Sequence, residues 1–378
     1  MIYLDNAATT KISDEVLQEM MPFLTEQYGN AGTLYSLGRA AYNAINKARL
    51  RVAKFINADP SQIIFTSGGT EANNMVFFNE TGYGGKCALV SEIEHDSVLN
   101  ASKRYYDVVP VKVMPNGKID IEMFARMMNE DFTIVSIMHT NNETGVTNPI
   151  AEIGEICKRY NVPFHTDCVQ AAGYHKLDVK EFNCDYLTIS SHKIHGPKGV
   201  GALYVKEPEK LIPLIKGGKA QEFGLRGGTE NVAAIVGFGK ACALATKRLE
   251  HNRNYINLLS ETFFTALQTA LDERAIRRIF HVNGETQYNP RKTYSIRFDG
   301  VSNETLLVML DARGVCVSAG SACTASEHKA SHVLKAIGLT DEQAKNSIRV
   351  SFSGMNTLEE VKDGAKIIAD CAAFLHKN

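Results

Sequence analysis

Short apolar runs alternate with amphipathic stretches through the first two thirds of the chain. The apolar runs have the length of β-strands and lie at residues 63–66, 87–90, 133–138, 163–165, 186–189 and 201–205. Between them, residues 41–56 put Ala41, Ile45 and Val52 on one helical face, and residues 151–160 repeat this spacing. Apolar strands that alternate with helices are typical of a mostly parallel sheet covered on both faces. The pattern therefore predicts an α/β domain.

The pattern changes after about residue 250. A long charged helix is predicted at residues 247–269, strands at 294–298 and 347–351, and a further helix at 358–375. This order is typical of an α+β unit. A length of 378 residues also fits two domains.

Composition and charge narrow the function classes. Hydrophobic residues make up 44% of the chain, and 41 basic residues face 42 acidic ones, for a formal net charge of −1. Such a balance provides no general attraction to nucleic acid or to anionic membranes, so neither is expected as a partner. The chain shows no signal peptide and no run of the roughly 18 apolar residues that a membrane helix needs. The eight cysteines form no CxxC pair, which predicts reduced thiols in the cytoplasm and no metal site.

A glycine turn after the first predicted strand is a candidate phosphate site. Residues 65–73 read Phe-Thr-Ser-Gly-Gly-Thr-Glu-Ala-Asn, in which a strand enters a turn and then a helical pattern. Backbone N–H groups at a helix start, together with hydroxyls, can hold a phosphate. Glycine at such a turn is also a common structural device, so the motif alone leaves both interpretations open.

Two charged residues at strand ends are candidates for cofactor chemistry. Lys193 follows a predicted strand and precedes a Gly-Pro turn, and Asp167 ends another strand. Taken alone, Lys193 could equally be a solvated lysine in a turn, and Asp167 could be a helix N-cap. Their order along the chain with the glycine turn and His95 suits pyridoxal 5'-phosphate, which needs a lysine, an acid, a stacking ring and a phosphate cup.

These residues belong to longer segments that carry a family resemblance. The segments are residues 3–10, 66–73, 141–145, 165–170, 190–199, 226–231, 318–324 and 347–349. In this order they resemble the cysteine desulfurases of the NifS/IscS type, which belong to the class V aminotransferase-like family of fold-type I pyridoxal phosphate enzymes. The resemblance implies a large cofactor domain of residues 15–255 with a mostly parallel seven-stranded sheet. It also implies a smaller α+β domain of residues 1–14 and 256–378.

The resemblance assigns roles to residues around the cofactor. Lys193 would hold it covalently, Asp167 would pair with the ring nitrogen, and His95 would stack on the ring and take part in catalysis. The phosphate and the ring edge would be contacted by Gly69, Thr70, Asn142, Gln170, Ser190 and His192. Thr229 would reach the phosphate of the neighbouring subunit, which implies a homodimer with shared active sites.

The resemblance also assigns the substrate contacts. Asn142 and Arg349 would bind L-cysteine, with the Arg349 guanidinium on its carboxylate. Cys323, in the segment Ser-Ala-Gly-Ser-Ala-Cys-Thr, would attack the substrate sulfur and become a persulfide while L-alanine is released. A sulfur-acceptor protein would then take the sulfur, for iron–sulfur cluster assembly, tRNA thiolation or a related pathway.

Other interpretations stay open within and beyond this class. An aminotransferase, epimerase, kynureninase-like enzyme or selenocysteine lyase could use the same scaffold, although a transaminase has no use for Cys323. A sulfur-relay scaffold without catalysis would be expected to lack Lys193 or Asp167. An NAD-binding protein is disfavoured because no G-x-G-x-x-G follows a strand. Departures from the family pattern at Ala31, Tyr35, Cys168 and Lys219 put substrate preference and partner handling in question.

Overall fold

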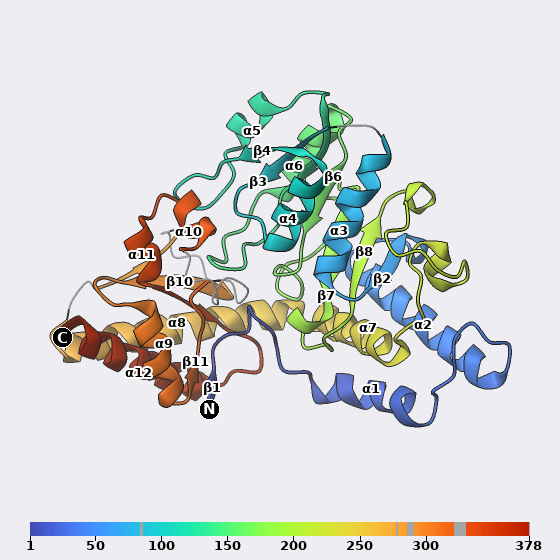
Figure 1. The fold of residues 1–378 in the computed structure, drawn as a ribbon. Coiled ribbons are helices and arrows are strands. Elements are labelled where there is room, and N and C mark those ends of the chain that lie inside the picture. Colours follow the sequence, from blue (N-terminus) through green and yellow to red (C-terminus); the bar gives the residue numbers. More distant parts are fainter. Residues whose placement is uncertain (84–85, 277–278, 286–290, 321–329, 378) are drawn as a thin grey trace.

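The computed structural model describes the whole chain except residues 84–85, 277–278, 286–290, 321–329 and 378. Cys323 therefore lies outside the described residues. Figure 1 shows a large α/β lobe beside a smaller lobe that contains both ends of the described chain.

A seven-stranded sheet forms the centre of the large lobe. Its strands lie in the order β2 (Ile63–Thr66), β8 (Gly201–Val205), β7 (Tyr186–Ser190), β6 (Phe164–Asp167), β5 (Phe132–Ser136), β3 (Cys87–Ser91) and β4 (Asp107–Val111). Only β8 runs against both of its neighbours, and the other adjacent pairs are parallel. The predicted α/β class with a mostly parallel seven-stranded sheet is confirmed.

Helices cover both faces of this sheet because its inner strands bury side chains on both sides. In β2, Ile63 and Phe65 pack into one hydrophobic core and Ile64 into the other, as the alternation of side chains along a strand requires. The first core contains residues of α1 (Asp14–Thr25), α2 (Ser36–Phe55), α5 (Ile121–Met127), α6 (Ile150–Arg159) and α7 (Val232–Lys247). The second contains residues of α3 (Gly69–Glu80) and α4 (Asp96–Tyr105).

The smaller lobe has a hydrophobic core of its own. An antiparallel sheet lies in the order β12 (Ser347–Ser351), β10 (Thr293–Phe298) and β9 (Phe280–Val282), and β1 (Ile2–Tyr3) pairs in parallel with β11 (Val315–Cys316). This core contains residues of α8 (Leu249–Glu273), α9 (Asn303–Ala312) and α12 (Leu358–Lys377). The short helices α10 (His332–Ala336) and α11 (Asp341–Lys345) pack against each other in a separate small cluster. Figure 1 shows α7 and α8 running below the sheet from one lobe to the other. The domain boundary at residues 255 and 256 stays a prediction.

Short 3-10 helices complete the described elements: η1 (Pro60–Gln62), η2 (Thr81–Tyr83), η3 (Ser191–Lys193), η4 (Pro208–Lys210) and η5 (Gln221–Gly224). No helix in the described part of the chain is both long and apolar enough to cross a membrane.

The observed elements differ from the predicted ones mainly at their ends. The strand predicted at residues 133–138 ends at Ser136, and the long helix predicted from residue 247 begins at Leu249, after α7 ends at Lys247. The sequence pattern missed β4. This strand lies at the sheet edge, is mostly not buried and contains Pro110, so it lacks the apolar run of an inner strand.

Candidate active site

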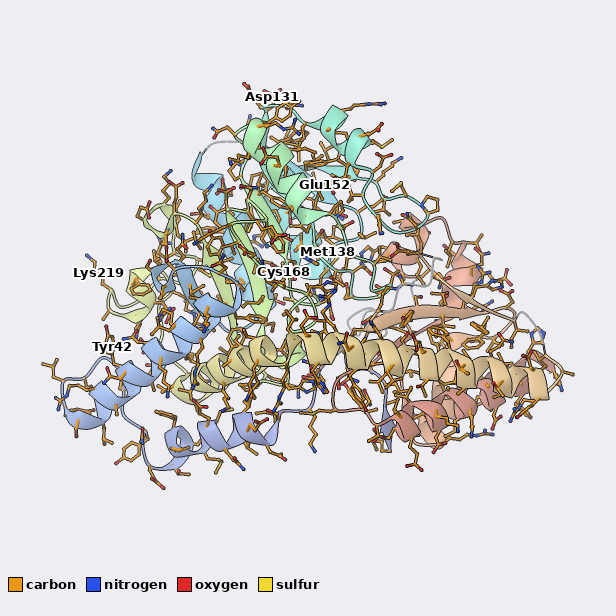
Figure 2. All side chains as sticks on the ribbon, turned by 180° about the vertical axis from the view of Figure 1, so that it is seen from behind. Tyr42, Asp131, Met138, Glu152, Cys168 and Lys219 are labelled. Atoms are coloured by element: carbon orange, nitrogen blue, oxygen red, sulfur yellow. The ribbon has the colours of Figure 1, made fainter. Side chains whose placement is uncertain are left out.

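A cavity of about 250 Å³ lies where β6 and β7 end. The carboxyl ends of parallel strands are the usual place for a ligand in such a sheet. The lining residues are Ala7, Ala8, Gly69, Thr70, Asn73, His95, Ser97, Met138, Asn142, Asp167, Val169, Gln170, Ser190, His192, Lys193 and Arg349. Figure 2 shows Met138 and the neighbouring Cys168 inside the molecule, whereas Tyr42, Asp131 and Lys219 lie at its periphery.

The ammonium group of Lys193 is held at this cavity by the N-terminal segment. Lys193 ends η3, directly after β7. Its Nζ donates hydrogen bonds to the carbonyl oxygens of Ala7 at 2.6 Å and Ala8 at 2.7 Å. A segment at the start of the chain therefore fixes the direction of a side chain from the middle of the sheet.

Asp167, the last residue of β6, is a buried carboxylate with two donors. Asn73 Nδ2 donates to its Oδ2 at 2.9 Å, and the backbone N–H of Val169 donates to its Oδ1 at 2.9 Å. The side chain of Asp167 is thus oriented from α3 and from its own loop. An ionised carboxylate held in this way can pair with a cationic ring nitrogen.

A short hydrogen-bonded chain connects Asp167 with His95. Asn73 Nδ2 also donates to Ser97 Oγ at 2.9 Å, and Ser97 Oγ lies 2.8 Å from His95 Nδ1. His95 is the N-cap of α4, where its Nδ1 accepts the backbone N–H of Ser97 at 3.1 Å. Because Nδ1 is an acceptor, the proton of the neutral imidazole lies on Nε2.

The start of α3 brings the predicted glycine turn to the cavity. Gly69 and Thr70 form the first turn, whose backbone N–H groups have no acceptors within the helix. Ser190 and His192 line the same cavity. Burial, with Lys193 and Lys198 nearby, lowers the pKa of His192 to about 4, so its imidazole is neutral at physiological pH.

Arg349 brings a buried guanidinium to the cavity from β12. It is 2% exposed, its Nη2 donates to Asp5 Oδ1 at 2.8 Å, and its Nη1 donates to the carbonyl of Asn142 at 3.2 Å. Its Nε is buried without a hydrogen-bond partner among the described residues. Arg349 is therefore oriented by both lobes and keeps a donor available for a ligand.

The residues around the cavity fit pyridoxal 5'-phosphate. Gln170 donates through Nε2 to the carbonyl of Ala7 at 2.9 Å, while its Oε1 and Asn73 Oδ1 are buried with no partner in the described part of the chain. Unsatisfied buried polar atoms are rare unless a ligand or water completes them. A lysine, a carboxylate, an imidazole and a helix start around one cavity are the groups that this cofactor needs.

Most of the predicted site residues lie together. The cavity contains ten of them: Gly69, Thr70, His95, Asn142, Asp167, Gln170, Ser190, His192, Lys193 and Arg349. Thr229 is exposed and does not line it, and Cys323 is outside the described residues. The sequence analysis missed Asn73, Ser97 and Asp5. The position of Asn73, one turn after Gly69 in the predicted helix, was the available signal.

Comparisons with known proteins identify the class of enzyme to which this fold and this site belong. The aminotransferase class-V family matches residues 2–363. A cysteine desulfurase IscS of Clostridium botulinum is 39% identical over 371 residues, which cover 95% of this chain and 91% of the relative. The chain therefore belongs to the cysteine desulfurases of the class V aminotransferase family, whose members are pyridoxal phosphate enzymes.

Solved structures agree with this assignment. A NifS-like protein from Rickettsia africae superposes with a TM-score of 0.86 at 33% identity, covering 100% of both chains. A structure of SspA in complex with cysteine gives a TM-score of 0.78 at 32% identity, covering 94% of this chain and 100% of that one. The predicted resemblance to the NifS/IscS type is thus confirmed.

Proposed function

We propose that this chain removes sulfur from L-cysteine with pyridoxal 5'-phosphate bound at the cavity, releases L-alanine and carries the sulfur as a persulfide on Cys323. One observation carries the proposal: Lys193, Asp167, His95 and Arg349 surround a single cavity at the strand ends. These are the groups for holding the cofactor, protonating its ring, moving protons and binding a substrate carboxylate.

We assign a partner in the cavity to each part of the cofactor. Asp167 would pair with the ring nitrogen, Lys193 would bind the aldehyde carbon, and the start of α3 with Ser190 and His192 would hold the phosphate. When bound, the cofactor supplies an electron sink for bonds at the α and β carbons of an amino acid. The buried, doubly hydrogen-bonded Asp167 supports this role because its charge is oriented before any ligand binds.

Arg349, Lys193 and His95 would bind and handle the substrate. Arg349 would bind the carboxylate of cysteine with its unpartnered Nε and fix the orientation of the α carbon. Lys193 Nζ, kept in the cavity by the Ala7 and Ala8 carbonyls, would move the α proton. The Nε2–H of His95 would provide a second proton, at the end of the hydrogen-bonded chain that lies away from Asp167.

Sulfur transfer requires a thiolate that can reach the substrate. The Cys323 thiolate would attack the substrate sulfur, so that an S–S bond forms and the Cβ–S bond breaks with its electron pair on carbon. Protonation of that carbon completes the methyl group of alanine. Burial raises the pKa of the Cys157, Cys168, Cys184 and Cys242 thiols, which disfavours those four as nucleophiles.

We also propose a homodimer with shared active sites. Thr229 is exposed, in a segment that Arg226 ties to Glu71 at the start of α3 by an ion pair of 2.9 Å. The helix α1 exposes an apolar stripe with helical spacing, formed by Leu17, Met21 and Leu24. These features support a partner subunit over this side of the molecule. Sedimentation velocity should give a dimer, and a concentration-independent monomer would contradict the proposal.

The sulfur acceptor is proposed to be a protein that meets the Cys323 loop. Iron–sulfur cluster assembly and tRNA thiolation both need such a sulfur donor, and the cofactor cavity does not distinguish between them. Capture of the persulfide-loaded enzyme should recover a partner with a reactive thiol. A cytoplasmic location stays a prediction from the pattern of reduced cysteines.

Product analysis tests the proposed reaction. Purified enzyme is incubated with L-cysteine and a thiol reductant, and sulfide and alanine are quantified for the wild type, Cys323→Ala and Cys87→Ala. The partly buried Cys87 lies at the amino end of β3, away from the cavity, and serves as the matched control. Equal sulfide and alanine from the wild type and from Cys87→Ala, with sulfide lost in Cys323→Ala, is the expected result. Bound cofactor without alanine formation would contradict the proposal.

A further inference from the structure

A second cavity, of about 170 Å³, shares Gln170 with the first. It lies between the loop after β5, the loop after β6, the start of α8 and the segment before β10. Its lining residues are Thr140, Gly145, Thr147, Gln170, Tyr174, His175, Arg253, Ile256, Asn257, Glu285, Arg291, Lys292 and Thr293. We call this space the basic cavity because of its three cationic side chains, Arg253, Arg291 and Lys292.

Lys292 contributes a buried ammonium group to the basic cavity. The residue is 8% exposed, and its Nζ is buried with no hydrogen-bond partner among the described residues. The ring of Tyr174 compensates part of its charge, with its centroid 4.5 Å from Nζ. Burial, with the charges of Lys193 and Arg349 nearby, lowers the pKa of Lys292 to about 7.

Arg291 adds further unused donors. It is also 8% exposed, and both its Nε and its Nη1 are buried with no acceptor in the described part of the chain. Nη2 donates to the carbonyl of Glu285 at 3.0 Å, and the guanidinium carbon lies 5.0 Å from the centroid of the Tyr294 ring. Arg253 is the most exposed of the three, with 54% of its side chain accessible, and its Nη1 lies 3.5 Å from Glu250 Oε1 at the surface.

Among the described lining residues Glu285 is the one carboxylate, and its charge offsets part of that of Arg291. The carboxylate of Glu285 pairs with Lys118 at 2.7 Å. Burial, with Arg253 and Lys292 nearby, lowers the pKa of His175 to about 4, so this imidazole is neutral near pH 7 and can donate one hydrogen bond. The basic cavity therefore presents an excess of positive charge and of hydrogen-bond donors.

A buried cation without a partner is costly, and an anion in the same space removes most of that cost. We propose that the basic cavity binds one small tetrahedral oxyanion, such as sulfate or phosphate, between Lys292, Arg291 and Arg253. The volume is sufficient, since a single water needs only about 10–15 Å³ of such space. The substrate carboxylate is assigned to Arg349 in the first cavity, so the two anions would occupy different places.

Anion binding to the holoenzyme tests this proposal without measuring turnover. Sodium sulfate, and in a second arm sodium phosphate, is titrated calorimetrically at constant ionic strength into the wild type, Lys292→Met, Arg253→Met and Lys362→Met. Lys362 is exposed on α12 and serves as the matched control. We expect one anion per chain for the wild type and for the control. Binding should be about tenfold weaker or more in the other two variants, because each loses a charge-assisted hydrogen bond.

Thermal stability gives a second measurement of the same site. Sulfate should raise the melting temperature of the wild type and of Lys362→Met by more than that of Lys292→Met, because sulfate stabilises all of these proteins through exclusion from their surfaces but binds more weakly to this variant. Arg253→Met removes a partly exposed side chain and keeps the test valid if the buried Lys292→Met variant fails to fold. Binding by neither anion, or equal binding in all four proteins, would overturn the proposal. Binding of only one anion would support it and identify the preferred ligand.

Discussion

Replacing Asn73 with alanine tests the hydrogen-bonded chain between Asp167 and His95. The amide of Asn73 donates at 2.9 Å to Asp167 Oδ2 and at 2.9 Å to Ser97 Oγ, and the residue is fully buried. Alanine removes both hydrogen bonds, so that among the described residues the backbone N–H of Val169 is the donor that remains for Asp167. The carboxylate would then be less well oriented toward the cofactor ring.

The expected loss of activity follows from the strength of the hydrogen bond to the charged Asp167 carboxylate. A hydrogen bond to a charged group contributes about 1.5–3 kcal/mol, which corresponds to roughly 10- to 150-fold in a rate or binding constant. Asn73→Ala should therefore lower kcat/KM for L-cysteine by roughly 10- to 150-fold, mostly through kcat. It should also weaken cofactor retention, measured by the absorbance of the bound cofactor after dialysis.

Asn74→Ala is the matched control. It changes the same residue type one position along α3, where the amide donates to the carbonyl of Thr70 at 2.9 Å and the side chain does not line the cavity. Urea denaturation followed by circular dichroism separates loss of activity from loss of fold. If both variants lose activity equally, or if Asn73→Ala keeps wild-type kcat and cofactor, the positioning role of Asn73 is wrong.

Three further predictions concern the backbone, protonation and the cofactor lysine. Gly145 has φ 70° and an added Cβ would lie 2.1 Å from the carbonyl oxygen of Thr293, so Gly145→Ala should lower the free energy of unfolding by about 2–5 kcal/mol. Gly199→Ala, at φ 78° with no described atom within 4 Å of the new Cβ, should cost only about 1–2 kcal/mol, and equal losses would refute the steric argument. Burial lowers the pKa of His165 to about 3, so the unfolded chain binds more protons and stability is lost as the pH falls below about 6.5. Between pH 6.5 and 5 this amounts to about 2 kcal/mol, and His165→Gln should reduce the pH dependence of unfolding by that amount; an unchanged pH dependence would contradict the assignment. Borohydride reduction should fix the cofactor on the peptide that contains Lys193, and a Lys193→Ala protein that still fixes it would show that another amine is used.

The fold was predictable where the strands are buried on both faces. Residues 63–66, 186–189 and 201–205 form nearly continuous apolar runs, and each lies within a strand with those bounds or one residue more. The edge strand β4 has no such run, and the two-residue strands β1 and β11 are too short to leave a pattern in the sequence. The hydrophobic pattern of a sequence reflects burial, so elements that are only weakly buried are not predicted from it.

Lys193 and Asp167 were predictable as site residues because each has a side chain suited to cofactor chemistry and lies at the end of a predicted strand. The contacts that orient them were not predictable, because they join residues far apart in the chain. Asn73 and Asp167 are 94 residues apart, and Lys193 lies 186 residues from Ala7. The basic cavity was not predictable for the same reason. Arg253 on α8 and Lys292 before β10 are distant in the chain and line one cavity in the folded protein.

Mass spectrometry of a single turnover tests the central claim most directly. Holoenzyme is mixed with one equivalent of L-cysteine without reductant, its free thiols are blocked, and its peptides are mapped. The account predicts one equivalent of alanine and one additional sulfur atom on the peptide that contains Cys323. Alanine formed with the additional sulfur on another cysteine, or on none, would contradict it.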